Sequence, residues 1–258
     1  MIKMTILIDS HIHLQATEYT DIPELLSQAR AAGIQAWIIP GTTLDDRSRQ
    51  LVLSTQLLNC FNAFGYHPWF LDSLPDHWEE RLQQTIENDQ PVAIGECGLD
   101  FSRDHHDLQQ VVFEAHVKMA DAFRLPLIIH SYKAVDQVLK ILRKYPAVTG
   151  VFHAFNGSLQ QLDQLIAMGY YVGFGGAVTY SRAKRLQSLL AKTPVTRLLI
   201  ETDGPYQAGA YAAPTEIHYP ADLAKIAHFI AEQKSLACSE LAKITTENAI
   251  NLFNLELK

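Results

Sequence analysis

Short apolar segments alternate with amphipathic segments along the whole chain, and this rhythm limits the folds that the chain can adopt. An apolar run begins at residue 6 and ends in a His-x-His pair at residues 11 and 13. Residues 21–32 then show apolar side chains at helical spacing before Gly33, and residues 34–40 are again apolar. A strand, a helix and a second strand in this order form a βαβ unit, whose strands run parallel.

The same unit repeats until eight strands are counted. After the first, we expect strands at residues 34–40, 60–66, 91–94, 125–129, 148–152, 170–174 and 197–200. We expect the intervening helices at residues 21–32, 44–58, 78–88, 109–123, 134–145, 159–168 and 183–191, and two closing helices at 221–232 and 239–253.

Eight continuous apolar strands with helical crossovers indicate a parallel sheet covered on its outside, and eight is the number that closes a barrel. The length of 258 residues suits one such domain. We therefore predict a (β/α)8 TIM barrel, with residues 1–258 as a single domain. The competing fold, an open doubly wound sheet, requires a glycine-rich phosphate loop after an early strand, and residues 9–14 do not form one.

Composition restricts the partners and the compartment. The net charge of −7 gives no overall basic field for a polyanion, so any contact with nucleic acid must be local. Three scattered cysteines do not make a disulfide framework, and no apolar run approaches the roughly 18 residues of a membrane span. We expect a cytoplasmic protein with no membrane association, and no obligate protein partner is evident.

Residues able to bind metals are concentrated at the carboxyl ends of the expected strands, where TIM barrels carry their active sites. Five of the eleven histidines occur at these ends. The strand ends carry His11, His13, His67, Glu96, His130, His153, Glu201 and Asp203.

Four imidazoles and two carboxylates in this set suffice for two divalent metal ions. We assign His11, His13 and Asp203 to one ion and His130 and His153 to the other. Glu96, on the strand between the two groups, is the natural bridging ligand. Nitrogen-rich ligands favour Zn²⁺, whereas phosphoryl substrates are often handled with Mg²⁺ or Mn²⁺.

Further residues near the mouth each have two interpretations. His67 either contacts a phosphate or leaving oxygen, or packs against Pro68 and Trp69. Asp100 is a candidate hydrogen-bond partner for a ligand histidine, and Lys133 is either a phosphate contact or a solvated side chain. The glycines of residues 173–176 either admit the substrate to the backbone or relieve crowding. Several aromatic residues near strand ends are candidates to stack bases or to wall an apolar pocket: Tyr66, Trp69, Phe70, Phe101, Phe155 and Tyr206.

Six short motifs occur in order along the chain. They are DSHIH at residues 9–13, GYHP at 65–68, GECGLD at 95–100, IHS at 129–131, FHAFNG at 152–157 and ETDGP at 201–205, followed by an Asn-x-x-x-x-Phe at 248–253. With these motifs the chain resembles the TatD family of metal-dependent hydrolases over essentially its whole length.

The resemblance implies a TIM barrel holding one or two divalent ions, with the same partition of ligands and Glu96 shared between them. It also implies a phosphodiester substrate, because family members are described as deoxyribonucleases, several of which trim from the 3′ end. Under this interpretation Glu96, Asp203 and His67 act in catalysis, and Asp203 orients or deprotonates the attacking water.

The chain departs from the family at the mouth of the barrel. The family's Arg-Asn-x-Pro segment is replaced by residues 210–220, and Tyr132 stands where an arginine commonly follows the His-Ser pair. A guanidinium is a better phosphate ligand than an ammonium or a phenol, so these losses bear on the substrate and leave the metal ligands intact. His218 either extends the site or lies in a surface loop.

Three functions remain open on the sequence. The first is a 3′-to-5′ exonuclease acting on single-stranded DNA or another phosphodiester. The second is a hydrolase of a small-molecule amide, ester or lactone, which the negative charge and the missing arginine favour. The third is a metal-bound barrel that serves as a binding module without catalysis.

Overall fold

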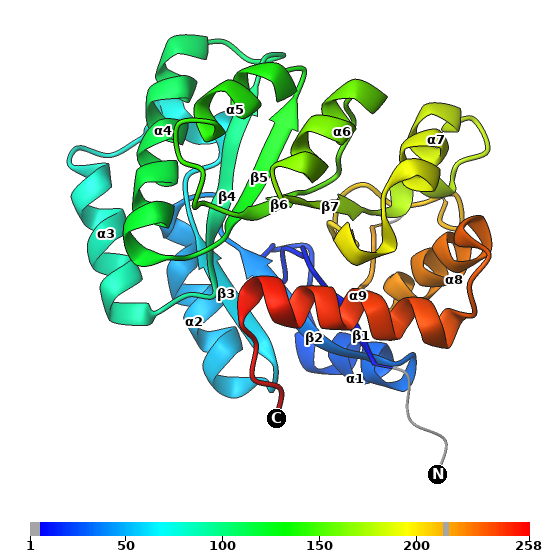
Figure 1. The fold of residues 1–258 in the computed structure, drawn as a ribbon. Helices are drawn as coiled ribbons and strands as arrows, with labels where there is room; N and C mark the ends of the chain where they lie inside the picture. The colour runs from blue at the N-terminus through cyan, green and yellow to red at the C-terminus, as the bar shows by residue number, and fades with distance from the viewer. Residues whose placement is uncertain (1–5, 214–216) are drawn as a thin grey trace.

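Eight parallel strands form one curved sheet in the computed structural model, which describes residues 6–213 and 217–258 (Figure 1). Neighbours in the sheet follow the chain order from β1 to β8, so the (β/α)8 TIM barrel is confirmed. The strands are β1 (Leu7–Asp9), β2 (Ile34–Pro40), β3 (Cys60–Phe64), β4 (Ala93–Asp100), β5 (Leu127–Tyr132), β6 (Gly150–Phe152), β7 (Tyr171–Phe174) and β8 (Leu198–Ile200).

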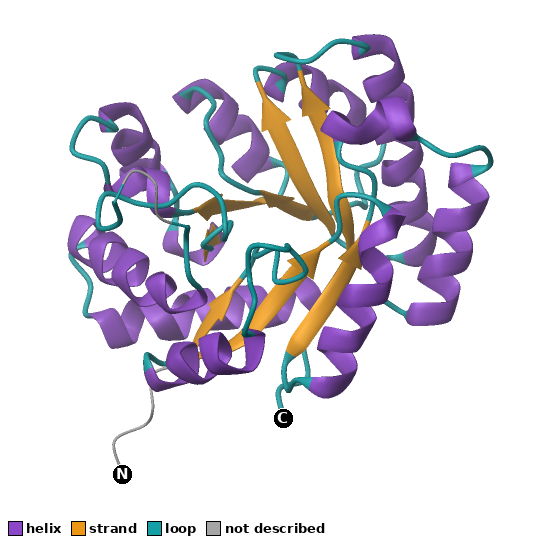
Figure 2. Ribbon diagram, turned by 180° about the vertical axis from the view of Figure 1, so that it is seen from behind, coloured by secondary structure: helices purple, strands orange, loops and turns teal. Residues whose placement is uncertain are grey.

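Helices surround the strands, as Figure 2 shows from the opposite side. They are α1 (Ile22–Ala31), α2 (Arg47–Gln56), α3 (Trp78–Asp89), α4 (His106–Phe123), α5 (Val135–Leu142), α6 (Leu159–Ala167), α7 (Lys184–Lys192), α8 (Leu223–Lys234) and α9 (Cys238–Phe253). Short 3-10 helices are η1 (Leu44–Asp46), η2 (Pro68–Ser73), η3 (Gly176–Thr179), η4 (Val195–Arg197) and η5 (Pro220–Asp222).

Main-chain and side-chain hydrogen bonds join β1 to β8 and so bring the two ends of the sheet together. The Ser10 N–H donates to the Ile200 carbonyl at 3.1 Å, and the Asp203 N–H donates to the His11 carbonyl at 2.8 Å. The buried Asp9 carboxylate accepts from the N–H and the hydroxyl of Thr202 at 3.0 and 2.6 Å. Because of this closure, the His-x-His pair lies beside Asp203 despite a separation of 190 residues or more.

Strand side chains that alternate in direction build two apolar clusters. One set, which includes Ile8, Ile38 and Leu199, packs against Leu252 and Phe253 of α9. Thr246 of α9 donates to the Ile6 carbonyl and Asn248 to that of Leu198, so α9 lies at the amino ends of β1 and β8. The opposite, carboxyl end of the barrel is left for the functional site.

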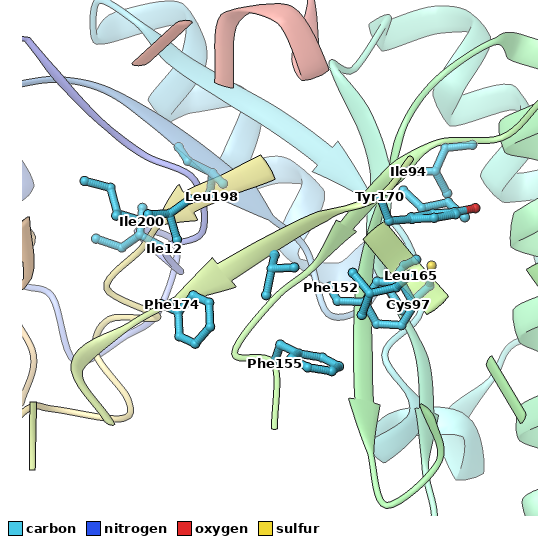
Figure 3. Close-up of a cluster of buried hydrophobic side chains, with 14 of the residues drawn as sticks. Ile12, Ile94, Cys97, Phe152, Phe155, Leu165, Tyr170, Phe174, Leu198 and Ile200 are labelled. Atoms are coloured by element: carbon cyan, nitrogen blue, oxygen red, sulfur yellow. The ribbon is translucent and has the colours of Figure 1, made fainter. Parts of the chain in front are cut away.

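The other set of strand side chains packs against the outer helices in the larger cluster, part of which is drawn in Figure 3. Phe152 of β6 meets the rings of Phe155 and Tyr170 edge-on, with centroids 6.2 and 5.5 Å apart. Leu165 of α6 belongs to the same cluster. Full burial of such side chains contributes roughly 1.5–3 kcal/mol each, so this layer holds the crossover helices on the sheet.

Most strand ends differ from the prediction by one or two residues, and two strands extend further than predicted. β4 continues past residue 94 to Asp100, and β5 continues past residue 129 to Tyr132. Gly95 and Gly98 interrupt the apolar run, but pairing continues between Gly98 and His130. A Cβ at Gly98, whose φ is +144°, would overlap the His130 carbonyl oxygen, so glycine permits this close approach. Glu96 and His130 therefore lie within strands and not just beyond them.

No helix in the described ranges 6–213 and 217–258 is long and apolar enough to cross a membrane. All three cysteines are free thiols.

Candidate metal centre

The seven site residues expected from the sequence meet at the carboxyl end of the barrel. The Nε2 atoms of His11 and His13 lie 3.2 Å apart, which shows that the pair projects in one direction from the end of β1. Six of the seven are buried and His130 is partly exposed. The seven side chains are those of His11, His13, His67, Glu96, His130, His153 and Asp203.

The Glu96 carboxylate stands at the middle of this cluster and faces histidines with both oxygens. Oε2 lies 3.2 Å from Nε2 of His11 and 3.5 Å from Nε2 of His13. Oε1 lies 2.8 Å from Nε2 of His153, 3.2 Å from Nε2 of His67 and 3.3 Å from Nδ1 of His130. One carboxylate thus touches both histidine groups.

The first group consists of His11, His13 and Asp203. Oδ1 of Asp203 lies 3.5 Å from Nε2 of each histidine, and Gln207 donates a hydrogen bond to the other carboxylate oxygen. Nδ1 of His13 lies 3.2 Å from the Pro40 carbonyl, which can only accept, so the ring proton belongs on Nδ1. The lone pair of His13 Nε2 then points into the cluster.

The second group consists of His130 and His153. Nδ1 of His130 and Nε2 of His153 lie 3.4 Å apart, and both adjoin Oε1 of Glu96. Nε2 of His130 lies 3.0 Å from Oδ2 of Asp100, so the expected contact of Asp100 with a candidate ligand histidine is present. That carboxylate places the ring proton on Nε2, and the Nδ1 lone pair of His130 faces Glu96.

His67 turns a ring proton, and not a lone pair, toward Glu96. The Trp69 N–H donates to Nδ1 of His67 at 3.1 Å, so the ring proton lies on Nε2 and points at Oε1 of Glu96. Burial lowers the pKa of His67 to about 4, which keeps the ring neutral. His67 packs against Trp69, as one interpretation expected, and also against Phe70, and it presents a donor to the cluster.

The electrostatics favour ionised carboxylates at the centre. Burial alone would raise the pKa of Glu96, but the surrounding imidazoles, His153 foremost, hold it well below its usual range. Burial likewise opposes ionisation of Asp203, and its contacts with His13 and His11 lower its pKa. The pKa of His153 is raised against its own burial by the negative charge of Glu96. Positive charge is therefore stabilised where these groups meet.

This donor set fits divalent cations. His11, His13 and Asp203 each offer a ligand atom, and all three atoms lie within 4.8 Å of one another. Glu96 forms a comparable group with His67 and His130, and its Oε1 lies 2.8 Å from Nε2 of His153. The carboxylates that face His13 and His130 raise the pKa of both rings against their burial, so a positive charge is favoured between these groups. Imidazole nitrogen together with carboxylate oxygen is the ligand chemistry of Zn²⁺ and related metals.

Glu201 has a structural role that the sequence reasoning missed. Its buried Oε1 accepts the Ala154 N–H at 2.6 Å and lies 3.8 Å from Nδ1 of His153. A Cβ added at Gly173 would overlap Oε2 of Glu201, so the glycine at the end of β7 makes room for this carboxylate. Of the two interpretations of residues 173–176, relief of crowding is the one that Gly173 supports. The only signal for this role in the sequence was the position of Glu201 at a strand end, two residues before Asp203.

A cavity of about 560 Å³ opens above the cluster. Exposed aromatic side chains of Trp69, Phe70, Tyr132 and Tyr206 line it, together with polar groups. Among the described residues that line it, none is a lysine or an arginine. Of the six aromatic residues expected near the mouth, Tyr66 and Phe155 are buried and do not line the cavity, and Phe101 instead stacks on His106.

Two further expectations concern the rim. Lys133 is exposed next to Tyr132 and does not line the cavity. His218 is fully buried, so the expectation of a surface loop is wrong. Its ring contacts the Tyr211 hydroxyl, and its carbonyl accepts from the Tyr19 hydroxyl at 2.5 Å, which anchors the loop after β8. Of the departing segment 210–220, residues 214–216 lie outside the described part of the chain.

Comparison with known proteins agrees with this geometry. A family model described as TatD related DNase matches residues 8–254. The chain belongs to the TatD family. An uncharacterized metal-dependent hydrolase of this kind, YabD from Bacillus subtilis (strain 168), is 34% identical, with 96% of this chain and 99% of the relative covered. The TatD chain described here is accordingly a metal-dependent hydrolase.

Two other relatives bear on fold and substrate. The crystal structure of YjjV, a TatD homologue from Escherichia coli K12, matches with a TM-score of 0.92 and 31% identity, covering 98% of this chain and 99% of that one. A protein named 3′-5′ ssDNA/RNA exonuclease TatD, from Pantoea sp. (strain At-9b), is 32% identical, with 96% of this TatD chain and 99% of the relative covered.

Proposed function

We propose that this protein removes nucleotides from the 3′ end of single-stranded DNA by metal-dependent hydrolysis of the phosphodiester bond. The candidate ligands are His11, His13 and Asp203 for one ion and His130 and His153 for a second, with Glu96 shared. The observation that carries the proposal is the position of Glu96, whose two oxygens contact the two histidine groups at 3.2 Å and 2.8 Å. A shared carboxylate is the usual feature of centres that bind two ions a few ångströms apart.

When bound, such ions would lower the pKa of a water molecule and neutralise charge on the phosphoryl oxygens. The protein's own groups then position the reactants. Asp203 is ionised beside the first group and is held by Gln207, so it can orient the attacking water and accept its proton. His67 is neutral with its proton on Nε2 beside Glu96, so it can donate a hydrogen bond to a phosphoryl or leaving oxygen that displaces or shares this contact.

The substrate class is supported by two observations. One is the exonuclease name carried by the Pantoea relative at 32% identity. The other is the cavity itself, in which the candidate metal ligands lie beneath a rim of exposed aromatic side chains. Aromatic side chains bind single-stranded nucleic acid by stacking on bases, with little dependence on sequence.

An end-labelled oligonucleotide assay tests the proposal. Purified protein is incubated with single-stranded DNA labelled at the 5′ end, and in parallel with RNA, in the presence of Mg²⁺, Mn²⁺ or Zn²⁺. We expect a ladder of shortened products with at least one metal, and loss of at least about 100-fold in rate for Glu96→Gln. Glu87→Gln makes the same chemical change on the exposed face of α3 and should retain the wild-type rate. Absence of shortening with every metal would exclude the nuclease.

A second candidate function is hydrolysis of an ester, amide or lactone of a small molecule. The observation in its favour is that none of the described residues lining the cavity is a lysine or an arginine, whereas Asp46, Glu96, Asp100 and Asp203 all line it. Such a lining favours a substrate with little negative charge. The test is to assay the metal-loaded protein on neutral aryl esters and lactones. Hydrolysis of one of these compounds that is lost in Glu96→Gln, with no shortening of DNA by the same protein, would favour this function over the first.

A further inference from the structure

Trp69 is exposed although it is tightly held. It belongs to η2 after β3, its side chain is 49% exposed, and it lines the cavity. Its backbone N–H donates to Nδ1 of His67, and its indole N–H donates to Oδ2 of Asp100 at 2.6 Å. A large apolar ring that is fixed at both ends and still open to solvent is a preformed surface for a flat ligand.

The carboxylate that holds Trp69 also holds a residue of the candidate metal centre. Oδ2 of Asp100 lies 3.0 Å from Nε2 of His130, and Oδ1 accepts from the N–H and the hydroxyl of Ser102. Burial opposes ionisation of Asp100, but its hydrogen bonds with His130, Ser102 and Trp69 place its pKa far below the usual range. The position of the indole is thereby coupled to that of His130.

One side of the indole already has a cation over it. The guanidinium carbon of Arg103 lies 4.5 Å from the centroid of the Trp69 ring. Arg103 does not line the cavity, so this cation covers the ring from outside it. Trp69 itself lines the cavity, and the rings of His67 and His130 approach it with centroids 5.3 and 6.2 Å away, so the indole borders the candidate metal centre.

We propose that Trp69 is a stacking site for a planar aromatic group of the substrate, namely the base of a nucleotide next to the scissile phosphodiester. This rests on the proposed function for the identity of the substrate, and its physical basis is the fixed, half-exposed indole. Asp100 positions that base relative to His130. Trp69 is thus a specificity-determining residue, which selects strands whose end carries a base.

Abasic substrates test this directly. Three oligonucleotides are compared as substrates: one unmodified, one with an abasic site at the 3′-terminal nucleotide, and one with it at the penultimate nucleotide. For the wild-type protein we expect removal of one of these bases to reduce kcat/KM by about 5- to 150-fold, the range that corresponds to loss of one base–aromatic stack. For Trp69→Leu the corresponding ratio should fall to near one, because the variant has no ring on which the base can stack.

The ratio also controls for folding, because a smaller fraction of folded protein lowers the rates on both strands by the same factor and leaves their ratio unchanged. Unchanged ratios in Trp69→Leu, whether the absolute rates fall or persist, would overturn the proposal and leave the nuclease function standing.

A second measurement does not depend on hydrolysis. The protein has three tryptophans, of which Trp37 is fully buried and Trp78 is stacked on His116, so Trp69 should report ligands in the cavity. We expect deoxynucleosides, but not deoxyribose, to quench the fluorescence of the metal-free protein, and the quenching to disappear in Trp69→Phe. If no DNA is hydrolysed, the proposed function fails and this result decides the stacking site: quenching that depends on Trp69 supports it, and absence of quenching overturns it.

Discussion

Nε2 of His153 and Oε1 of Glu96 lie 2.8 Å apart, which is the shortest of the contacts between Glu96 and the histidines around it. The other oxygen of the same carboxylate lies 3.2 Å from Nε2 of His11. Residues from β1 and from the end of β6 are therefore joined through one side chain of β4. This arrangement makes Glu96 the residue on which both halves of the candidate centre depend.

Removal of metal should destabilise the protein through this residue. An ion that binds only the folded state stabilises it by about 2.7 kcal/mol at a concentration of 100 times its Kd. For a chain of this size we expect a chelator to lower Tm by roughly 5–10 °C. Thermal unfolding of Glu96→Gln should show little response to the chelator. An equal shift in both proteins would contradict the shared role of Glu96.

Loss of the carboxylate charge at Asp100 should weaken metal binding on the His130 side alone. Asp100→Asn keeps the shape but no longer favours the tautomer of His130 that has its proton on Nε2. Calorimetric titration should show one of two sites weakened by about 10- to 100-fold and the other unchanged. Asp76→Asn, on the exposed surface, is the matched control and should bind like wild type. Equal weakening of both sites would argue against the partition of ligands.

Glycine at residue 173 should be required for stability, because the Glu201 carboxylate occupies the space that a side chain would need. A methyl group at residue 173 would overlap the Glu201 carboxylate and displace it from the Ala154 N–H, so Gly173→Ala should cost about 1–3 kcal/mol of unfolding free energy. In a Glu201→Ala background the overlap is absent, and the same substitution should cost much less. Denaturant unfolding of the four proteins of this cycle measures the coupling, and additive effects would refute the account.

Acid should destabilise the protein in part through His116. This residue of α4 is fully buried, accepts the Tyr66 N–H at Nε2 and contacts the Val112 carbonyl at Nδ1. Burial lowers its pKa to about 4 from the usual 6.5, so between these values the unfolded chain binds the proton and the folded chain does not. The free energy of unfolding therefore falls as the pH decreases through this window.

The non-titrating variant His116→Gln isolates this effect. The difference in unfolding free energy between wild type and variant should change by up to about 3 kcal/mol from pH 7 to pH 4, in the direction that disfavours wild type at low pH. Denaturant unfolding at a series of pH values measures it. Parallel pH profiles for the two proteins would show that another group is responsible.

The sequence predicted the order of strands and the members of the cluster for one physical reason. Carboxyl ends of parallel strands meet at one end of a barrel, so His11 and Asp203 could be placed together without knowledge of any distance. The extent of β4 could not be predicted in the same way. Glycines at 95 and 98 interrupt the apolar pattern, and only pairing with β5 reveals that the strand continues.

Other features depend on contacts that no local pattern encodes. The tautomer of His67 follows from the Trp69 N–H in η2, and the position of Glu201 follows from the space left at Gly173 of β7. The sequence favours a surface loop for His218, which follows no expected strand, yet His218 is buried and its ring and carbonyl contact the hydroxyls of Tyr211 and Tyr19. Such roles become visible only when distant segments are placed side by side.

Anomalous diffraction from crystals grown with Zn²⁺ or Mn²⁺ tests the central claim most directly. We expect two peaks in the anomalous difference map, one coordinated by His11, His13 and Asp203 and the other by His130 and His153, with Glu96 bound to both. Metal at other positions, or no peak beside Glu96, would contradict it.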